Sequence, residues 1–217
     1  MIRTITRQKP FEEIMQLIGE STRVFLMGCG TCATLCRTGG MPEVLQMAST
    51  LKENDKVVTG HIIIPVACDE LSHEILEQCK DPIQDSEVLL IATCAFGVQT
   101  MTGQTRLRVI PALDTLFVGK EAGVGKFNEI CTQCGSCVLG VTGGICPVTS
   151  CHKGLLNGPC GGTNNGKCEI DSDKDCAWTL IYTRLKEQGQ LDLMRRYQDP
   201  RNHNVEPRPG KIWIPFE

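Results

Sequence analysis

Cysteines grouped at short intervals are the residues of this chain with the clearest chemistry. Fourteen of the 217 residues are cysteines. The densest group is Cys131-Thr-Gln-Cys134-Gly-Ser-Cys137, and Cys146 follows directly before Pro147. Thiolates separated by two or three residues can converge on one metal centre. The spacing therefore predicts that the chain binds metal through sulfur.

Eight cysteines between residues 131 and 176 predict two metal sites with four ligands each. Three closely spaced cysteines followed by Cys-Pro are typical of the cluster-binding segment of bacterial ferredoxins, although eight residues separate Cys137 from Cys146 here. Zinc ribbons more often use two separated cysteine pairs. We therefore predict iron–sulfur clusters, with zinc in place of one cluster as an alternative, and the spacing leaves the division of the ligands open. The predicted ligands in this half are Cys131, Cys134, Cys137, Cys146, Cys151, Cys160, Cys168 and Cys176.

The first 125 residues alternate between predicted strands and predicted helices. Short apolar runs and amphipathic segments succeed each other from residue 9 to residue 118. This alternation favours parallel strands joined by crossover helices, which is a doubly wound, Rossmann-like α/β sheet. The predicted helices are Lys9–Gly19, Pro42–Lys52 and Asp69–Gln78, the predicted strands are Val24–Met27, Val57–Ile64, Val88–Ala92 and Thr115–Val118, and Phe96–Met101 is ambiguous.

Three of the predicted strands are each followed by a cysteine. Cys29 follows the first strand, Cys68 the second and Cys94 the third, and Cys32 and Cys36 lie on the loop after the first strand. Functional sites in doubly wound sheets lie at the carboxyl ends of the strands. A cubane takes four thiolates, so we predict Cys29, Cys32, Cys36 and Cys94 as ligands, with Cys68 in reserve. The alternative for Cys68 and Cys94 is that they are ordinary small buried side chains.

The sequence changes character near residue 126, which predicts a second domain over 126–217. This part is rich in cysteine and glycine and has few apolar residues at a regular period, so we expect metal to organise it. A helix is predicted at Ala177–Glu187, followed by a helical turn at Leu191–Tyr197. The segment Asp199–Glu217 is predicted to be an extended tail whose apolar end docks on a surface. Gly119–Gly125 is interpreted as a linker.

Composition and the lack of several motifs exclude other classes of function. The net charge is −3 and no basic stripe is evident, so nucleic-acid binding is not expected. No apolar stretch approaches the ~20 residues of a membrane span. The start of the sequence does not resemble a signal peptide, and the chain is long enough to bury a core without disulfides, so we predict a reducing, cytoplasmic location. Phosphate-binding and dinucleotide motifs are not found, so we expect no flavin and no catalytic residue in this chain.

Several short motifs together resemble a known family. They are Cys131-TQ-Cys134-GS-Cys137, TGGI-Cys146-Pro147, Cys151-HKGLLNGP-Cys160-GG, GK-Cys168 and Cys176-AW, preceded by Gly28-Cys29-GT-Cys32 and Cys36-RTGG. The later motifs resemble the cysteine-rich C-terminal domain of some methylenetetrahydrofolate reductases. With the earlier motifs they resemble the MetV-type small, iron–sulfur subunit of the acetogen-type enzyme.

This resemblance implies a role as a non-catalytic electron-transfer subunit of an oxidoreductase complex. Its partner would be a flavin-containing TIM-barrel large subunit that reduces methylenetetrahydrofolate to methyltetrahydrofolate, and a further electron-donating subunit is compatible with it. The setting implied is anaerobic one-carbon metabolism of the Wood–Ljungdahl type. The cysteine count sets the predicted cofactors at two or three [4Fe–4S] clusters. The alternatives are a zinc-binding assembly module of the same complex and a thiolate–zinc methyl-transfer protein.

Overall fold

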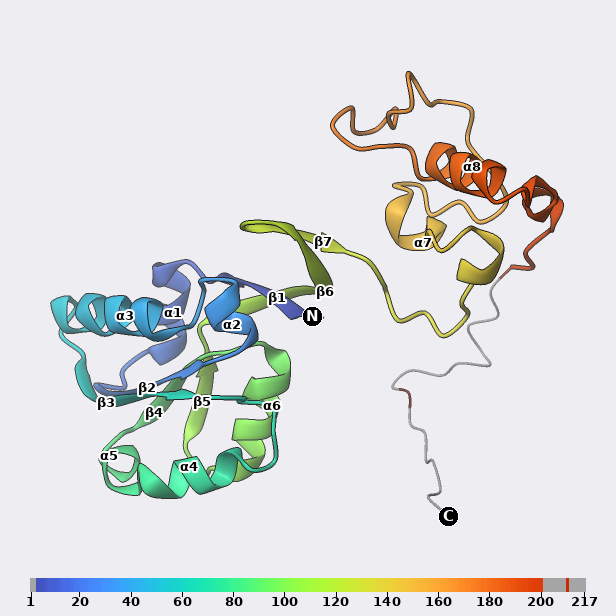
Figure 1. Cartoon of the computed structure of the whole chain (residues 1–217). Helices are drawn as coiled ribbons and strands as arrows, with labels where there is room; N and C mark the ends of the chain where they lie inside the picture. The colour runs from blue at the N-terminus through green and yellow to red at the C-terminus, as the bar shows by residue number, and fades with distance from the viewer. Residues whose placement is uncertain (1–2, 201–209, 211–217) are drawn as a thin grey trace, which may run out of the picture. The chain divides into compact units, whose positions relative to one another are not determined.

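The protein forms two compact units, Met1–Asn128 and Glu129–Glu217. The computed structural model describes residues 3–200 and residue 210 (Figure 1). The tail predicted at Asp199–Glu217 therefore lies outside the described residues, apart from positions 199, 200 and 210.

The first unit is built on a four-stranded parallel sheet in the order β3-β2-β4-β5. Helices α1 and α3 cover one face of this sheet and α4, α5 and α6 cover the other (Figure 1). The predicted doubly wound α/β fold is thus confirmed. The strands are β2 (Arg23–Cys29), β3 (Val57–Ile64), β4 (Val88–Ala92) and β5 (Arg108–Pro111). The helices are α1 (Phe11–Ile18), α2 (Cys32–Leu35), α3 (Met41–Glu53), α4 (Ser72–Gln78), α5 (Lys80–Gln84) and α6 (Ala95–Gln104).

The core of this unit lies on both faces of β2 and β4. Val88, Leu89, Leu90 and Ile91 are each at most 1% exposed. Strands covered by helices on both sides are apolar along their whole length, which is why they could be predicted from the sequence. The bounds predicted for Val57–Ile64 and Val88–Ala92 agree with β3 and β4.

A second, antiparallel sheet corrects two predictions. Its strands are β1 (Arg3–Gln8), β6 (Leu113–Gly123) and β7 (Lys126–Glu129), in the order β1-β6-β7. The strand predicted at Thr115–Val118 belongs to β6, where it pairs antiparallel with β1 and takes no part in the parallel sheet. The linker interpretation of Gly119–Gly125 is also wrong, because this segment ends β6 and turns into β7. Gly125, with φ of +70°, supplies the left-handed conformation at that turn.

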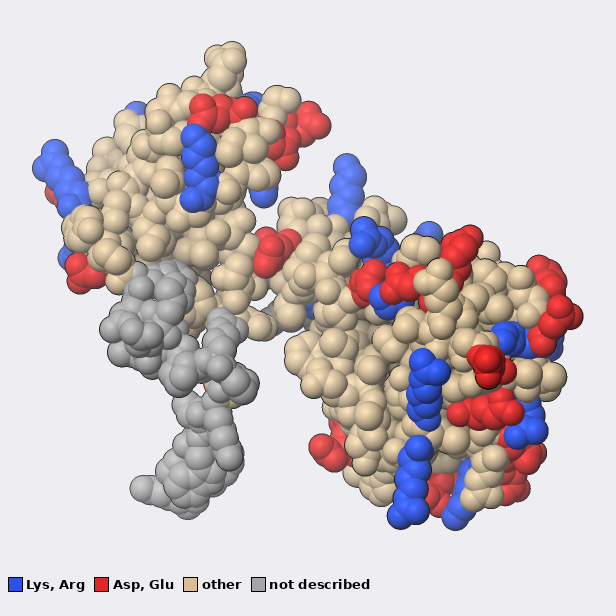
Figure 2. Space-filling view, turned by 180° about the vertical axis from the view of Figure 1, so that it is seen from behind, with Lys and Arg blue, Asp and Glu red and all other residues tan. Residues whose placement is uncertain are grey.

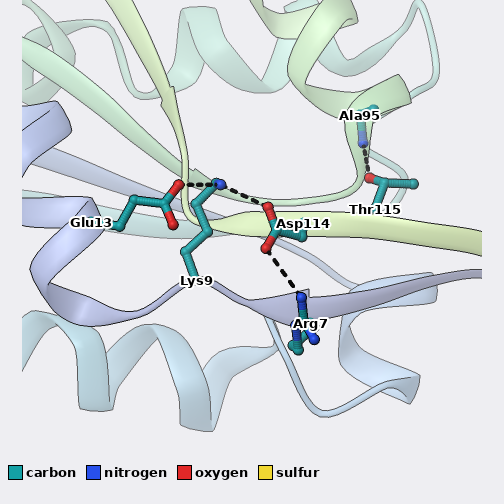
Figure 3. Close-up of polar contacts among 6 residues, drawn as sticks. All are labelled: Arg7, Lys9, Glu13, Ala95, Asp114 and Thr115. Atoms are coloured by element: carbon teal, nitrogen blue, oxygen red, sulfur yellow. Dashed lines mark hydrogen bonds and ion pairs between the residues drawn. The ribbon is translucent and has the colours of Figure 1, made fainter.

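Charged side chains fix the start of β6 to the junction of β1 and α1 (Figure 3). The Lys9 ammonium lies 2.7 Å from an Asp114 carboxylate oxygen and 2.5 Å from Glu13. Hydrogen bonds to these two carboxylates raise the pKa of Lys9, and the bond from Lys9 lowers the pKa of Asp114. At the same edge, the backbone N–H of Ala95 donates to the Thr115 hydroxyl at 2.8 Å, which ties the first turn of α6 to β6.

The second unit has little regular structure and a small apolar core. It contains η1 (Leu139–Val141), α7 (Pro147–Ser150), α8 (Ala177–Glu187) and η2 (Leu191–Arg195). Helix α8 has the predicted bounds and buries Trp178, Ile181 and Leu185 on one face. The Trp178 indole N–H donates to the carbonyl oxygen of Leu155 at 3.0 Å, which fixes a long loop to this helix.

Charges of both signs are mixed on the surface of the first unit. Figure 2 shows one face on which Lys and Arg side chains are interspersed with Asp and Glu over the first unit. Among the described residues, no helix combines the length and the apolar character that crossing a membrane requires.

Candidate metal centres

The eight cysteines of the second unit fall into two sets of four that follow each other along the chain. The first thiol set is Cys131, Cys134, Cys137 and Cys146, which line one pocket of about 200 Å³. The second thiol set is Cys151, Cys160, Cys168 and Cys176, which line a separate cavity of about 20 Å³. The structure thus provides the division of these cysteines that the spacing left open.

Backbone turns and hydrogen-bond donors shape the first thiol set. Gln133 and Gly135, which alternate with the cysteines, have φ of +54° and +75°. The Gln133 N–H donates to the Cys131 sulfur at 3.3 Å, and the Thr149 hydroxyl donates to the Cys146 sulfur at 3.4 Å. The left-handed backbone conformation is strained for a residue that carries a side chain, so the surrounding structure must hold Gln133 in it. This conformation forms the tight turn that brings the Gln133 N–H to the Cys131 sulfur.

The second thiol set has a charged pair beside it. The Gly162 N–H donates to the Cys160 sulfur at 3.4 Å, and the Cys160 thiol donates to a Glu169 oxygen, also at 3.4 Å. Lys153 forms an ion pair with the same carboxylate. The hydrogen bond between them raises the pKa of Lys153 and lowers that of Glu169, so both groups are charged at neutral pH.

Cys176 lies at the start of α8, where backbone N–H groups favour the thiolate. Burial raises the pKa of Cys176, but hydrogen bonds from Thr179, Thr163 and the Trp178 N–H outweigh it, and the pKa is lowered overall. A thiol at a helix N-terminus is a recurrent form of activated sulfur ligand. His152, which the sequence places beside Cys151, is 3.5 Å from the Asp171 carboxylate.

The donor chemistry fits a thiolate-bound cluster. In a cubane each of the four thiolates binds a different iron, so the sulfurs surround a volume and do not meet at one point. In the first thiol set, four cysteines line one pocket and the Gln133 N–H donates to the Cys131 sulfur. Within the described part of the chain, no group of three or more His, Cys, Asp or Glu side chains is placed to hold a single metal ion.

The cysteines of the first unit lie at the carboxyl edge of the parallel sheet. Cys29 is the last residue of β2 and Cys94 follows β4; they are 5% and 7% exposed. Cys32 begins α2, and Cys68 is exposed on the segment between β3 and α4. Burial raises the pKa of Cys68, and the charges of Cys94, Cys29 and Cys32 raise it further. The loop that carries Cys68 contacts Gly30 through Pro65 and Gly97 through Ala67, so it lies beside the segments that carry Cys29, Cys32 and Cys94.

Cys36 differs from the other four cysteines at this edge. Its thiol lies 3.9 Å from the carbonyl oxygen of Thr4 on β1. Burial raises the pKa of Cys36, and Cys32 is the cysteine whose charge contributes to that rise. The structure therefore places Cys68, which the sequence put in reserve, with Cys29, Cys32 and Cys94, and it places Cys36 against β1.

Sequence reasoning missed the hydroxyl and charged groups around the thiols. Thr149 lies three residues after Cys146, and Thr179 lies three residues after Cys176. Both cysteines immediately precede a helix, so the spacing Cys-x-x-Thr places a hydroxyl one turn above the sulfur. The Cys-x-x-Thr spacing could therefore have predicted these hydroxyl groups from the sequence. Glu169 has no comparable signal, since only the folded loop brings it to Cys160.

The comparison with known proteins concerns mainly the cysteine-rich part. Residues 110–204 match the family model described as methylene-tetrahydrofolate reductase C terminal. The matched range contains both thiol sets and α8. No curated protein and no solved structure matches the chain. The cysteine-rich segment is therefore similar to the C-terminal domain of methylenetetrahydrofolate reductases.

Proposed function

We propose that this chain is the iron–sulfur electron-transfer subunit of a methylenetetrahydrofolate reductase complex, of the MetV type. The observation that carries the proposal is the division of eight cysteines into two four-thiol sets, each lining its own pocket, inside the segment related to that enzyme. Each set would hold one [4Fe–4S] cluster. A bound cluster of this kind takes up and releases single electrons.

The residues around the thiols set the electronic environment of the proposed clusters. The N–H groups of Gln133 and Gly162 donate to ligand sulfurs, which raises the reduction potential of a cluster. Lys153 brings a positive charge close to the second thiol set, but its pairing with Glu169 offsets much of that charge. The first thiol set has no such charged pair among its pocket-lining residues, so the two centres would differ in potential.

The proposed partner is a flavin-containing large subunit, where methylenetetrahydrofolate would be reduced to methyltetrahydrofolate. This chain would exchange electrons with that flavin, with a further electron-donating subunit as a compatible source. Many closely spaced free thiols fit a reducing compartment, so the proposed location is the cytoplasm. The resemblance to the MetV-type subunit would place the chain in anaerobic one-carbon metabolism of the Wood–Ljungdahl type.

The size of the second cavity favours a second candidate for that site. About 20 Å³ is space for a group the size of a water molecule. A cubane would enter only if the loops that carry Cys160 and Cys168 moved outward. A zinc ion is smaller and is commonly held by four cysteines, although the thiols of this set would have to draw together to ligate a single ion. Zinc at the second thiol set would make that site structural and leave electron transfer to the first set.

Metal and sulfide analysis of the full chain, purified anaerobically, tests both candidates. Two clusters predict about eight irons and as many sulfides per chain from this unit. Cys134→Ser and Cys168→Ser should each lose about four irons. Cys79→Ser is the matched control, because Cys79 ends α4 and packs against the sheet core of the first unit.

The outcomes separate the candidates. Loss of zinc and retention of iron in Cys168→Ser would assign zinc to the second thiol set. A wild-type chain that contains zinc but no iron or sulfide would refute the electron-transfer proposal. A potentiometric titration followed by electron paramagnetic resonance gives an independent readout, since Cys134→Ser should remove one reducible signal and leave the rest.

A further inference from the structure

The carboxyl edge of the parallel sheet is the place in the first unit where loops from neighbouring strands diverge. Strand β2 lies between β3 and β4, so the chain leaves β2 toward one neighbour and returns later to the other. Open α/β sheets bind their ligands at such a switch point. The residues that reach this point are Cys29 at the end of β2 and Cys94 just beyond β4.

Close backbone contacts bring the loop after β3 over the end of β2. The register pairs Cys29 with Ile64. The N–H of Gly30 donates to the carbonyl oxygen of Ile64 at 2.8 Å. A Cβ atom on Gly30 would lie only 3.2 Å from the backbone of Pro65, so the two segments touch. The loop that carries Cys68 therefore starts directly beside Cys29 and Cys32.

The same loop also contacts the first turn of α6. A Cβ atom on Gly97 would lie 3.0 Å from the Cβ atom of Ala67. Ala67 precedes Cys68 and is 1% exposed, and Gly97 follows Cys94 by three residues. The hydrogen bond from Ala95 to Thr115 holds this turn in place (Figure 3). Cys68 and Cys94 are thus placed together by packing of their own neighbours.

The thiols at this edge range from buried to exposed, as expected for a site that opens to solvent on one side. Cys29 and Cys94 are buried, Cys32 is half-buried and Cys68 is exposed. The Cys29 sulfur has a polar partner, the Thr31 hydroxyl at 3.1 Å. Ordinary core cysteines are scattered and lie against apolar side chains, whereas here four come from three separate loops to one edge.

We infer that Cys29, Cys32, Cys68 and Cys94 form a third metal centre, which binds an iron–sulfur cluster in the first unit. Cys36 is not a ligand, because its thiol lies against the Thr4 carbonyl on β1. A cubane suits thiols that surround a space, whereas a zinc ion would need them about 2.3 Å from a single point. This inference is independent of the proposed function, because its residues lie outside the segment matched by the reductase family model.

Serine substitutions at Cys68 and Cys36 test the assignment in the full chain. Cys68 is exposed, so Cys68→Ser should fold as the wild type does, which circular dichroism checks. We expect Cys68→Ser to lose about four irons and four sulfides per chain, together with one reducible resonance signal. Cys36→Ser, the matched control on the same loop system, should retain all of them.

Three results would overturn the inference. They are loss of iron in Cys36→Ser with retention in Cys68→Ser, full iron retention in both variants, and loss of zinc in place of iron. The measurement also separates this inference from the proposed function. If the second unit held only zinc, the wild-type chain would contain about four irons, and Cys68→Ser would lose them while Cys134→Ser kept them.

Discussion

Gly39 is the residue whose replacement gives the sharpest test of the packing at the carboxyl edge. The loop after α2 crosses the end of β4 here. A Cβ atom on Gly39 would lie 2.0 Å from the carbonyl oxygen of Ala92 and 2.9 Å from its carbonyl carbon, and ordinary contact begins at 3.4 Å. Both atoms belong to the backbone of a central strand. Gly39→Ala therefore requires the loop to move away by about 1.4 Å.

The expected cost follows from the contacts that this movement disturbs. The N–H of Cys29 donates to the Gly39 carbonyl at 3.1 Å, and the Gly39 N–H donates to the Ala33 carbonyl at 3.2 Å. Overpacking costs about 1–3 kcal/mol, and each weakened hydrogen bond adds about 1 kcal/mol. Gly39→Ala should therefore lower the free energy of unfolding of the first unit by about 3–5 kcal/mol, a large part of the stability of a typical domain.

Urea denaturation followed by circular dichroism measures this loss, and Gly103→Ala is the matched control. Gly103 lies inside α6, and a Cβ atom there would meet nothing within 4 Å. The same chemical change should stabilise the first unit by about 0.5–1 kcal/mol. Trp178 lies in the core of the second unit, so the unfolding transition that reports its burial should not move in either variant. A Gly39→Ala variant with wild-type stability would refute the argument from close approach.

Three further predictions concern the core of the second unit and the ion pair of the first. Ile181→Ala should destabilise the second unit by about 2–5 kcal/mol, whereas Leu180→Ala, on the exposed side of α8, should cost less than about 0.5 kcal/mol. Calorimetric transitions measure both, and equal effects would contradict the assigned face. Trp178→Phe removes a buried N–H donor and should cost about 1 kcal/mol in the same assay; no change would mean that this hydrogen bond does not contribute. Lys9 lowers the pKa of Asp114, so the pair stabilises the first unit above the ordinary carboxyl pKa of 3.8, and this contribution is lost as the pH falls through the lowered value. Unfolding measured from about pH 5 to pH 2 should show this loss in the wild type and not in Asp114→Asn, and identical acid profiles would disprove it.

The fold was predictable where a segment carries its own signal. Strands β3 and β4 and helix α8 have the predicted bounds, because a buried strand is apolar along its length and an amphipathic helix has a clear period. Strand β1 was not predicted, since Arg3–Gln8 has mostly polar side chains. Its partner β6 lies more than 100 residues later in the chain, so β1 becomes a strand through this pairing and not through local hydrophobicity.

The sequence predicted which cysteines belong to the candidate sites, but it did not predict how they are grouped in space. Spacing alone singled out the cysteines, because short gaps between thiols are rare outside metal sites and disulfide scaffolds. It did not divide the eight cysteines of the second unit, since the division depends on where the loops run. It also favoured Cys36 over Cys68, because Cys36 is near Cys32 in the chain. The single turn of α2 ends at Leu35, and Cys36 then lies against β1.

The three groups of thiols differ in the length of chain between their first and last cysteine. The first thiol set spans residues 131–146 and the second spans 151–176, without overlap, whereas the group at the sheet edge spans 29–94. Short segments close at a lower entropic cost, so each thiol set of the second unit can gather its ligands while the rest of the chain is unfolded. The group at the sheet edge exists only once β2, β3 and β4 have paired. With the proposed clusters at these three places, maturation would have an intrinsic order, in which the sheet forms before its edge accepts iron and the second unit completes its folding as its metal binds.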